Sequence, residues 1–242
     1  MSGADKLTLR GGKSRRTGYF MVELTGPAMA LQRAGYELVF ADPTGGEPTM
    51  DPASDGARWY PSAKDYAAAK RFIASSKGLR HPVKLRALDA AALKGFKAFF
   101  APGGHAPMED LYADPDMGRI LRHFHEAGKP TALICHAPVA LLAAVEDVKG
   151  AAGAGSKAWT YQGYAMTVFS TAEEQQEEAP SALDGQVLFY PADALRAAGA
   201  VVTSSAPWTS HAVVDRELIT GQNPMSEAEF TKLFLRRLAQ RP

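Results

Sequence analysis

The sequence predicts an α/β fold in which helices connect the strands of a mostly parallel sheet. A helical pattern over residues 19–34 ends at Gly35 and is followed by the strand-like run 36–41. A second apolar run, 131–134, ends on Cys135 and leads directly into another helix-like stretch. Strand-like and helix-like stretches continue to alternate toward the C-terminus. Parallel strands require such crossover connections, whereas antiparallel strands can be joined by short turns.

The same patterns give the elements expected along the chain. We expect strands at 6–10, 36–41, 96–101, 131–134, 164–169, 201–203, 210–214 and 217–220, and helices at 19–34, 63–76, 87–93, within 108–128, and at 138–145, 192–198 and 226–239. An Ala/Gly-rich loop is expected at 149–155. The stretch 47–93 is too long for one ordinary connection between a helix and a strand. We therefore expect a single domain, residues 1–242, with an insertion or small cap at about 47–93.

Composition narrows the class of protein. The 242 residues are 46% hydrophobic and 22% charged, which is ordinary for a soluble globular protein. A net charge of +1 gives no electrostatic case for a nucleic-acid or anionic-membrane partner. The longest apolar runs fall short of a membrane span, and the basic, polar N-terminus does not resemble a secretory signal. Arg15 and Arg16 are expected in a solvated basic loop.

The single cysteine, Cys135, excludes an internal disulfide framework and a Cys-rich zinc site. It fits a reducing compartment, so we expect a cytoplasmic protein. His123 and His125 are two residues apart on an expected helix and would point to different sides, which argues against a shared metal. We expect no metal and no cofactor.

Cys135 lies where the strand 131–134 turns into a helix, and His136 follows it directly. The unpaired N–H groups and the dipole of a helix N-terminus favour a negative charge. Such a position is expected to lower the pKa of the Cys135 thiol, and the thiolate is the nucleophilic form. The alternative is that Cys135 is a small buried apolar residue, which is common for free cysteines.

Two further stretches carry candidate site residues. Gly103 and Gly104 follow the expected strand 96–101 and precede His105, so their backbone N–H groups are suited to hold an anion. This turn comes one crossover before Cys135, at the sheet edge where open α/β folds bind ligands. Glu23 interrupts an apolar run and lies either on an exposed face or buried, where it would hold its proton more tightly than in water.

Glu173 and Glu174 follow Ser170, which is a good helix N-cap. Glutamates in a first helical turn complement the dipole, so a solvated helix start explains most of this run. The alternative is that one of the two carboxylates turns inward and orients His136.

With these residues in place, the chain resembles the DJ-1/PfpI superfamily of class I glutamine-amidotransferase-like folds, and within it the Hsp31-like, glutathione-independent glyoxalase branch. The matching landmarks are Gly18 with Glu23, Ala34-Gly35-Tyr36-Glu37, Pro43-Thr44-Gly45-Gly46, Asp51-Pro52, Pro102-Gly103-Gly104-His105, Ile134-Cys135-His136, Thr167–Phe169 followed by Glu173-Glu174, and Leu218-Ile219-Thr220-Gly221-Gln222-Asn223-Pro224. The resemblance implies a three-layer α/β sandwich with a mostly parallel, flavodoxin-like central sheet and a nucleophile elbow.

The resemblance also implies roles for individual residues. Cys135 is expected as the nucleophile and His136 as its catalytic partner. Glu23 is expected as the acid that contacts the thiol, and Glu174 as the acid that orients His136, with Glu173 as the fallback. The expected pocket wall and oxyanion donors are Gly103, Gly104, His105 and Ala137. Ala106 and Ala137 stand where the family usually has glycine.

The activity that this resemblance implies is cofactor-free conversion of methylglyoxal or glyoxal to lactate or glycolate through Cys135. One alternative is a cysteine amidase or peptidase-like hydrolase that uses the same nucleophile. Another is a stress-response holdase chaperone or redox sensor, in which Cys135 is oxidised rather than turning over substrate. The expected partners are a small aldehyde substrate and a second copy of the chain in a homodimer.

Overall fold

A four-stranded sheet forms the centre of the computed structural model, which describes residues 1–148 and 156–240. Its strand order is β11 (Ala212–Asp215), β12 (Leu218–Gly221), β6 (Thr131–Ile134) and β5 (Phe99–Ala101). β12, β6 and β5 are parallel, and β11 joins β12 as the expected antiparallel hairpin.

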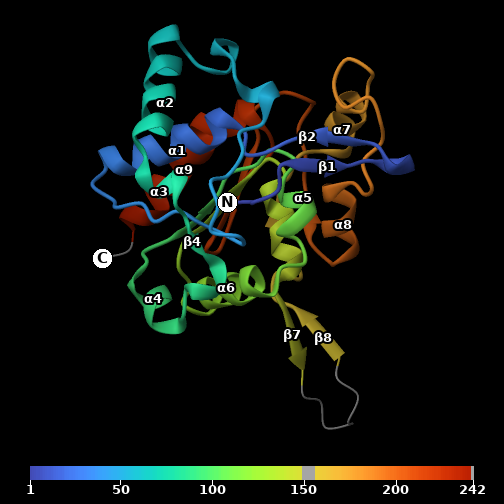
Figure 1. Ribbon diagram of the computed structural model, residues 1–242. Coiled ribbons are helices and arrows are strands. Elements are labelled where there is room, and N and C mark those ends of the chain that lie inside the picture. The colour runs from blue at the N-terminus through green and yellow to red at the C-terminus, as the bar shows by residue number, and fades with distance from the viewer. Residues whose placement is uncertain (149–155, 241–242) are drawn as a thin grey trace.

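Helices cover both faces of this sheet, which confirms the predicted three-layer α/β class (Figure 1). On one face, α9 (Glu227–Ala239) packs on β6 and β12, and α1 (Met21–Arg33) packs on α9 and on α2 (Ala63–Ser75). On the other face, α6 (Pro115–Glu126) packs on β6 and on the 3-10 helix η5 (Ala137–Ala143). The short helices α5 (Pro107–Asp110) and α8 (Pro191–Ala197) pack on η5.

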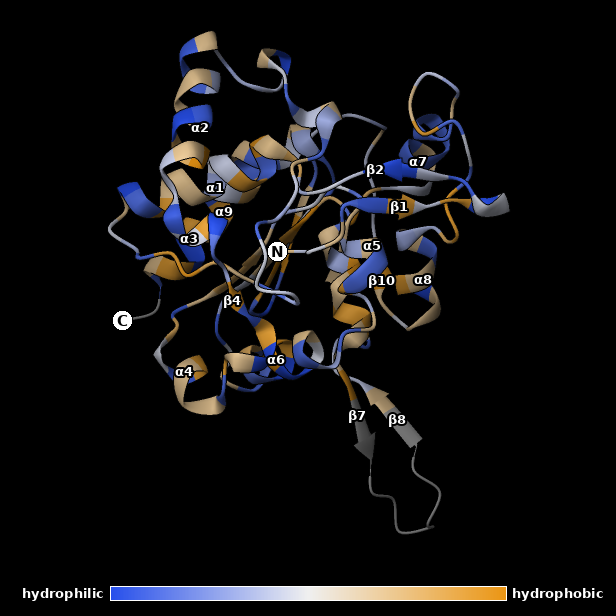
Figure 2. Cartoon of the chain, viewed as in Figure 1, coloured by the Kyte–Doolittle hydropathy of each residue, from blue (hydrophilic) through white to orange (hydrophobic). Residues whose placement is uncertain are grey.

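The apolar colouring of the central strands in Figure 2 reflects burial on both faces. All four residues of β6 are buried. Leu133 packs into the cluster that contains Leu121 of α6, whereas Ile134 packs into the cluster that contains Phe230 of α9. A parallel strand covered on both sides reads as a continuous apolar run, which explains the sequence pattern that ends on Cys135.

The remaining elements surround this body. They are β1 (Lys6–Thr8), η1 (Arg10–Gly12), β2 (Ser14–Arg16), β3 (Ala41–Asp42), η2 (Pro52–Ser54), η3 (Ala57–Trp59), α3 (Lys77–Arg80), β4 (Val83–Lys84), η4 (Leu85–Ala87), α4 (Ala90–Gly95), β7 (Val145–Val148), β8 (Ser156–Trp159), β9 (Ala165–Met166), α7 (Thr171–Glu177), β10 (Val201–Val202) and η6 (Pro224–Ser226). The β7–β8 hairpin projects away from the rest of the molecule (Figure 1). None of the described helices is long and apolar enough to cross a membrane.

Several sequence expectations differ from the observed elements. The strand expected at 6–10 is β1, which pairs with β2 outside the central sheet. The helix expected at 138–145 is the 3-10 helix η5, which begins one residue earlier and ends at Ala143. The loop expected at 149–155 lies outside the described residues. The 47–93 segment contains α2, α3, β4, most of α4 and three 3-10 turns, η2, η3 and η4.

The largest difference concerns the strand expected at 36–41. Only Ala41 and Asp42 form a strand, β3, and it pairs with β4 rather than with β5. Residues 36–40 carry no strand assignment although their sequence, Tyr-Glu-Leu-Val-Phe, strongly favours one. A segment is assigned as a strand only when it has a hydrogen-bonded partner. Within the described residues no strand pairs with this segment on the side that faces β5, so residues 36–40 are not assigned as one.

Candidate active site

Cys135 occupies a strained turn at the carboxyl end of β6. Its φ angle is 61°, in the left-handed region that few non-glycine residues adopt. Two backbone hydrogen bonds hold the turn: the Cys135 N–H donates to the Gly221 carbonyl, and the Phe169 N–H donates to the Cys135 carbonyl, each at 2.8 Å. A side chain at Gly103 would meet the Cys135 Cβ at 2.5 Å, so only glycine fits there. Such strain persists where the surrounding structure over-determines it, often at functional sites.

A chain of hydrogen bonds leads from the thiol to a buried carboxylate. The Cys135 Sγ lies 3.1 Å from His136 Nδ1, and His136 Nε2 lies 2.8 Å from Glu174 Oε2. His105 Nε2 lies 2.8 Å from the other Glu174 oxygen. An ionised carboxylate only accepts hydrogen bonds, so Nε2 of both histidines carries the proton. The His136 Nδ1 lone pair is then free to accept the proton of the thiol.

Aromatic rings fix the plane of His136. Its ring stacks on Phe169 with centroids 4.3 Å apart, and the His105 ring lies 4.0 Å away on a tilted plane. Trp208 packs edge-on against Phe169. Nothing in the sequence pattern marks Phe169 or Trp208 as site residues, because an aromatic residue at the end of a strand is usually a core residue.

The charges at the two histidines follow from their shared carboxylate. Burial opposes the charge of Glu174, but His105 and His136 outweigh it and hold the pKa of that carboxyl well below its usual range. Burial also opposes a charge on His105, yet the attraction of Glu174 raises the pKa of this imidazole. Burial, together with the charge of His105, lowers the pKa of His136 to about 4. At neutral pH, His136 is therefore a neutral acceptor beside the thiol.

Glu23 is fully buried in the first turn of α1. Burial raises the pKa of its carboxyl to about 8, and the neighbouring Cys135 thiol and Gly103 backbone oppose only part of this rise. Within the described residues neither carboxyl oxygen of Glu23 has a hydrogen-bond partner. Cys135 and Gly103 therefore lie next to the carboxyl without forming a hydrogen bond to it. The carboxyl is thus protonated at neutral pH and lies beside the nucleophile.

The expectation that the turn lowers the pKa of Cys135 is wrong. Burial and the adjacent Glu23 carboxyl raise the pKa of the thiol well above its usual value, although the Gly104 backbone opposes this. The element that follows is a short 3-10 helix rather than an α-helix, and Cys135 is only 2% exposed. The loss of hydration raises the pKa of the thiol by more than the backbone N–H groups lower it.

The backbone N–H of Gly104 faces the Cys135 sulfur. Gly104 has a φ angle of 86°. A side chain at Gly104 would meet the Gly18 carbonyl oxygen at 2.1 Å, which excludes any other residue. The His136 N–H has no backbone partner within the described part of the chain. The Gly104 N–H is therefore placed near an oxyanion formed on an atom bonded to Sγ, and the His136 N–H has no backbone acceptor that would compete for it.

The structure separates the two glutamates of α7. Glu174 contacts His136 and His105, as described above. Glu173 instead caps its own helix through Ser170 and accepts hydrogen bonds from the side-chain amides of Gln222 and Asn223. Of the two glutamates, Glu174 is therefore the one that contacts His136, and Glu173 is a buried residue that ties α7 to the Gln222-Asn223 segment.

A cavity of about 600 Å³ opens above the thiol. Of the predicted site residues, Gly104, His105, Cys135 and His136 line it. Gly103 and Ala137 are not among the lining residues, and the Ala137 methyl packs into the core beside η5. The other lining residues are Arg15, Arg16, Phe20, Asp51, Pro52, Ala53, Arg58, Trp59, Phe169, Glu177, Ser181, Ala182, Leu183, Trp208 and Pro224. Arg15 and Arg16 were expected in a solvated loop; they are exposed, but they also border this cavity.

His105, His136 and Glu174 also offer ligand atoms that lie within 4.8 Å of one another. Such a group has the composition of a divalent metal site. Each Nε2 atom lies 2.8 Å from a Glu174 oxygen, which is the distance of a hydrogen bond. The Nε2 protons therefore explain why these three side chains lie close together. His125, for which the sequence argued against a metal shared with His123, forms a hydrogen bond with Glu217 at 2.7 Å.

Comparisons with known proteins show the family to which the chain is related. The family model described as DJ-1/PfpI family matches residues 17–237. The glutamine amidotransferase-like class 1 domain-containing protein 1 of Bos taurus is 30% identical over 81% of this chain and 78% of its own length. The protein/nucleic acid deglycase HchA of Staphylococcus aureus is 26% identical over 93% of this chain and 73% of its own.

Solved structures share the fold over nearly the whole chain. Glyoxalase III from Candida albicans superposes with a TM-score of 0.72 at 21% identity, covering 97% of this chain and 93% of its own. The Rapid Encystment Protein 24 kDa of Francisella tularensis superposes with a TM-score of 0.77 at 24% identity, covering 98% and 96%. The chain belongs to the DJ-1/PfpI family.

Proposed function

We propose that the protein converts a 2-oxoaldehyde such as methylglyoxal into the corresponding 2-hydroxy acid, without a cofactor. The observation that carries the proposal is the Cys135 thiol held between a proton acceptor, His136 Nδ1, and a protonated carboxyl, Glu23. The reaction needs both kinds of group at one sulfur. The deglycase and glyoxalase III names of the similar proteins support the same class of chemistry.

In the first step, the Cys135 sulfur adds to the aldehyde carbon and forms a hemithioacetal. The thiol proton passes to His136, and a proton from Glu23 reaches the aldehyde oxygen. The Gly104 and His136 N–H groups stabilise the oxygen as its negative charge develops.

In the second step, a base removes the hydrogen of the former aldehyde carbon and gives an enediol. Glu23, which the first step has left ionised, is suited to this role because a pKa of about 8 lies near the operating pH. As the enediol forms, His136, which the first step has left protonated, gives its proton to the ketone oxygen. Glu23 then returns the abstracted proton to the neighbouring carbon, and the hydroxyl proton of the former aldehyde carbon passes back to His136. The former ketone is now a hydroxyl, and the sulfur carries a thioester. Water then cleaves the thioester, releasing the 2-hydroxy acid and the thiol with no net oxidation or reduction.

The test is incubation of the purified protein with methylglyoxal in the absence of glutathione, followed by chiral detection of lactate. We expect lactate from the wild type and none from Cys135→Ala. Absence of lactate, or full activity in Cys135→Ala, would overturn the proposal.

The size of the Cys135 cavity favours a second candidate, cleavage of a larger acyl or amide substrate by the same nucleophile. A cavity of about 600 Å³ is at the size of drug-like ligand sites and exceeds what a three-carbon aldehyde needs. Arg15, Arg16 and Arg58 border it and would attract an anionic group. Peptide anilides and N-acetylated amino-acid amides are the substrates to assay. Faster turnover of these than of methylglyoxal would favour the hydrolase.

We further propose that the protein acts as a homodimer in the cytoplasm, with residues 1–242 as one domain and about 47–93 as its cap. Sedimentation equilibrium of the purified chain tests the dimer. A mass near 25.9 kDa would contradict it.

A further inference from the structure

The central sheet ends at β5, and within the described residues the outer edge of β5 has no neighbouring strand. In a parallel ladder, alternate residues bond to a given neighbour. The Phe99 N–H donates to the Pro130 carbonyl, on the side of β6. The N–H and C=O of Phe100 therefore point the other way, out of the sheet. An unpaired edge of this kind is a template for another strand.

The segment 36–40 faces this edge from across a gap. The Phe40 carbonyl accepts a hydrogen bond from the Val83 N–H of β4, so the segment is paired on its outer side. Within the described residues, the backbone groups of Glu37, Leu38 and Val39 have no hydrogen-bond partner. This segment has the sequence of a central strand and lacks the neighbour that such a strand requires.

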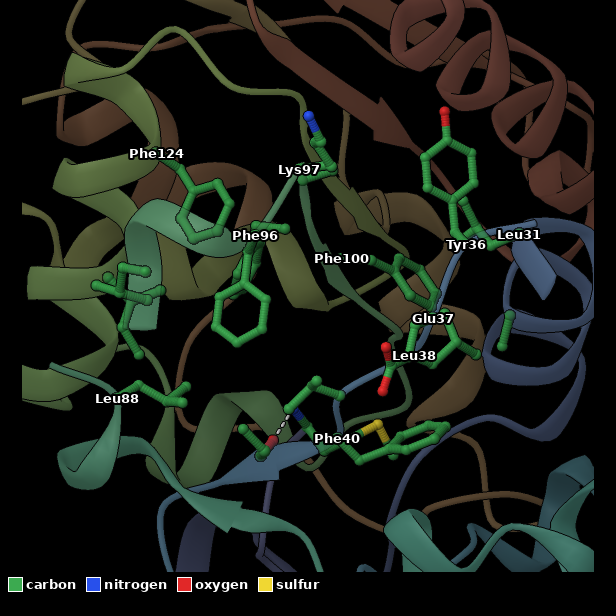
Figure 3. Close-up of a pocket in the computed structure, with 18 of the residues that line it drawn as sticks. Leu31, Tyr36, Glu37, Leu38, Phe40, Leu88, Phe96, Lys97, Phe100 and Phe124 are labelled. Atoms are coloured by element: carbon green, nitrogen blue, oxygen red, sulfur yellow. Dashed lines mark hydrogen bonds between the residues drawn. The ribbon is translucent and has the colours of Figure 1, made fainter. Parts of the chain in front are cut away.

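The gap between β5 and the segment 36–40 is a cavity of about 480 Å³, which we call the strand slot (Figure 3). Its volume far exceeds the ~30 Å³ that one water molecule occupies. Leu38, Phe96 and Phe100 are gathered around it in Figure 3, and all three are only half-buried. On the neighbouring strand β6, every residue is buried.

Helices close the strand slot on both faces of the sheet. Leu24, Ala28 and Leu31 of α1 line it together with Phe234 and Leu238 of α9; Met117, Ile120 and Phe124 of α6 line it with Ala92 and Leu93 of α4. α1 with α9 and α6 form opposite outer layers of the fold. The strand slot therefore lies in the middle layer, where the rest of the molecule has strands.

Met1 lies at one end of the strand slot. Its α-amino group donates to the Ala41 carbonyl at 2.8 Å, and the residue is buried among the lining side chains. Phe40 accepts on one side of the segment and Ala41 on the other, as alternate carbonyls of a strand do. Met1 shows that a polypeptide backbone fits against this inner edge.

We propose that the strand slot accepts one extended apolar strand, which pairs with Phe100 on one side and with Glu37 and Val39 on the other, since the alternation that turns the Ala41 carbonyl inward also turns the backbone groups of these two residues inward. The hydrogen-bonded ladder that runs from β11 to β5 would then continue through the strand slot to β3 and β4. A lipid or other apolar ligand would fill the volume but would leave the backbone groups of both walls without partners. Only a polypeptide backbone supplies donors and acceptors to two edges at once.

The experiment adds a synthetic strand to the full chain and measures amide hydrogen exchange by NMR. The probe is the acetylated, amidated peptide Lys-Val-Ile-Val-Val-Ile-Lys. At a peptide concentration 100 times its Kd, we expect exchange of the Phe100 and Val39 amides to slow by about 100-fold. The matched control is Lys-Val-Pro-Val-Pro-Ile-Lys, which keeps apolar character but loses two N–H donors.

A fusion guards against weak binding in solution. The apolar peptide is joined in front of Met1 by a short Gly/Ser linker, and the proline peptide is fused in the same way. We expect slower exchange at Phe100 and Val39 only with the apolar strand. Leu38→Lys, which places a charge in the strand slot, should abolish the effect, whereas Val214→Lys on β11, the opposite edge of the sheet, should not.

Three results would overturn the proposal. One is unchanged exchange at both amides with the free and the fused apolar strand. Another is equal protection by the proline peptide, which would show an apolar ligand site that does not read backbone. The third is protection without any peptide that rises with protein concentration, which would show that a second copy covers the slot. None of these measurements depends on catalytic activity.

Discussion

The Cys135 cavity and the strand slot differ in whether the polar groups of their walls have hydrogen-bond partners. Around Cys135 the two histidines, Glu174 and the thiol are matched one to one: each Glu174 oxygen has its histidine, and His136 Nδ1 has the thiol. The carboxyl oxygens of Glu23 are the exception within the described residues, because neither has a hydrogen-bond partner there. The walls of the strand slot are mostly apolar side chains, with Glu37 and Lys97 also lining it, and backbone groups of 37–39 that lack partners within the described residues. The first cavity is organised for chemistry, and the second is organised to receive a strand. Both use β5 and α1, since β5 leads into Gly103 and α1 carries Glu23 and Leu24.

The strongest test of the matched cavity removes its charge. Glu174→Gln keeps the shape of the side chain but offers one acceptor and one donor to two N–H groups. One histidine must then turn or change tautomer, and His136 loses the partner that keeps Nδ1 free. We expect kcat/KM toward the 2-oxoaldehyde to fall by about 10⁴-fold, as tautomer loss does in other nucleophile–histidine–acid sites.

Glu126→Gln, an exposed change on α6, is the control for Glu174→Gln and should keep wild-type kinetics. Steady-state kinetics with circular dichroism of both variants separates loss of activity from loss of fold. Activity within tenfold of wild type in folded Glu174→Gln would show that Glu174 does not orient His136.

A pair of leucines compares packing in the sheet with packing at the strand slot. Leu133 in β6 is completely buried, whereas Leu38 is half-buried at the slot wall. We expect Leu133→Ala to lower the free energy of unfolding by about 3–4 kcal/mol and Leu38→Ala by about 1 kcal/mol, because the cost grows with the buried apolar volume that the substitution removes. Urea titration measures both. Equal decreases would mean that the slot wall is already as well packed as the core.

The two regions also differ in what the sequence could reveal. Cys135, His136 and the Gly103-Gly104 turn lie in short segments at strand ends, so their chemistry could be predicted from order and residue type. Whether Glu23 is buried could not be decided from its own run, because burial depends on Gly103 and Cys135, which are distant in sequence. The pKa of Cys135 was predicted in the wrong direction, since desolvation by the surrounding fold exceeds the local effect of the turn.

The strand slot shows a different limit. Residues 36–41 were predicted as a strand from composition, and the local pattern is sound. A strand, however, exists only with a partner, and the sequence of one segment does not say whether its neighbour is present. Phe169 and Trp208 were missed for a related reason: their role beside His136 is a matter of tertiary contact.

The buried Glu23 predicts a pH dependence of stability. Its carboxyl has a pKa of about 8 in the folded protein and about 4.5 when exposed. Between these values the folded state holds a proton that the unfolded state has lost, so the free energy of unfolding falls as the pH rises from about 4.5 to about 8. Glu23→Gln stays neutral and lacks this decline. We therefore expect the stability of the variant relative to wild type to increase across this range.

Chemical denaturation of wild type and Glu23→Gln at pH 5, 6.5 and 8.5 measures the Glu23 contribution. Other titrating groups, including His136, are common to both proteins and cancel in the difference. A difference that does not change with pH would mean that Glu23 is already ionised in the folded protein.

The smallest expected effect concerns Ala137, which stands where the family usually has glycine. Its methyl group is fully buried in the core beside η5 and does not line the Cys135 cavity. Ala137→Gly should therefore lower the free energy of unfolding by about 1 kcal/mol, through reduced burial and a more flexible backbone, and leave KM within about twofold. Thermal denaturation and steady-state kinetics with methylglyoxal measure the two quantities. A lower KM in Ala137→Gly would show that the methyl group lies in the path of the substrate. Ala137 would then affect the Cys135 cavity as well as the core.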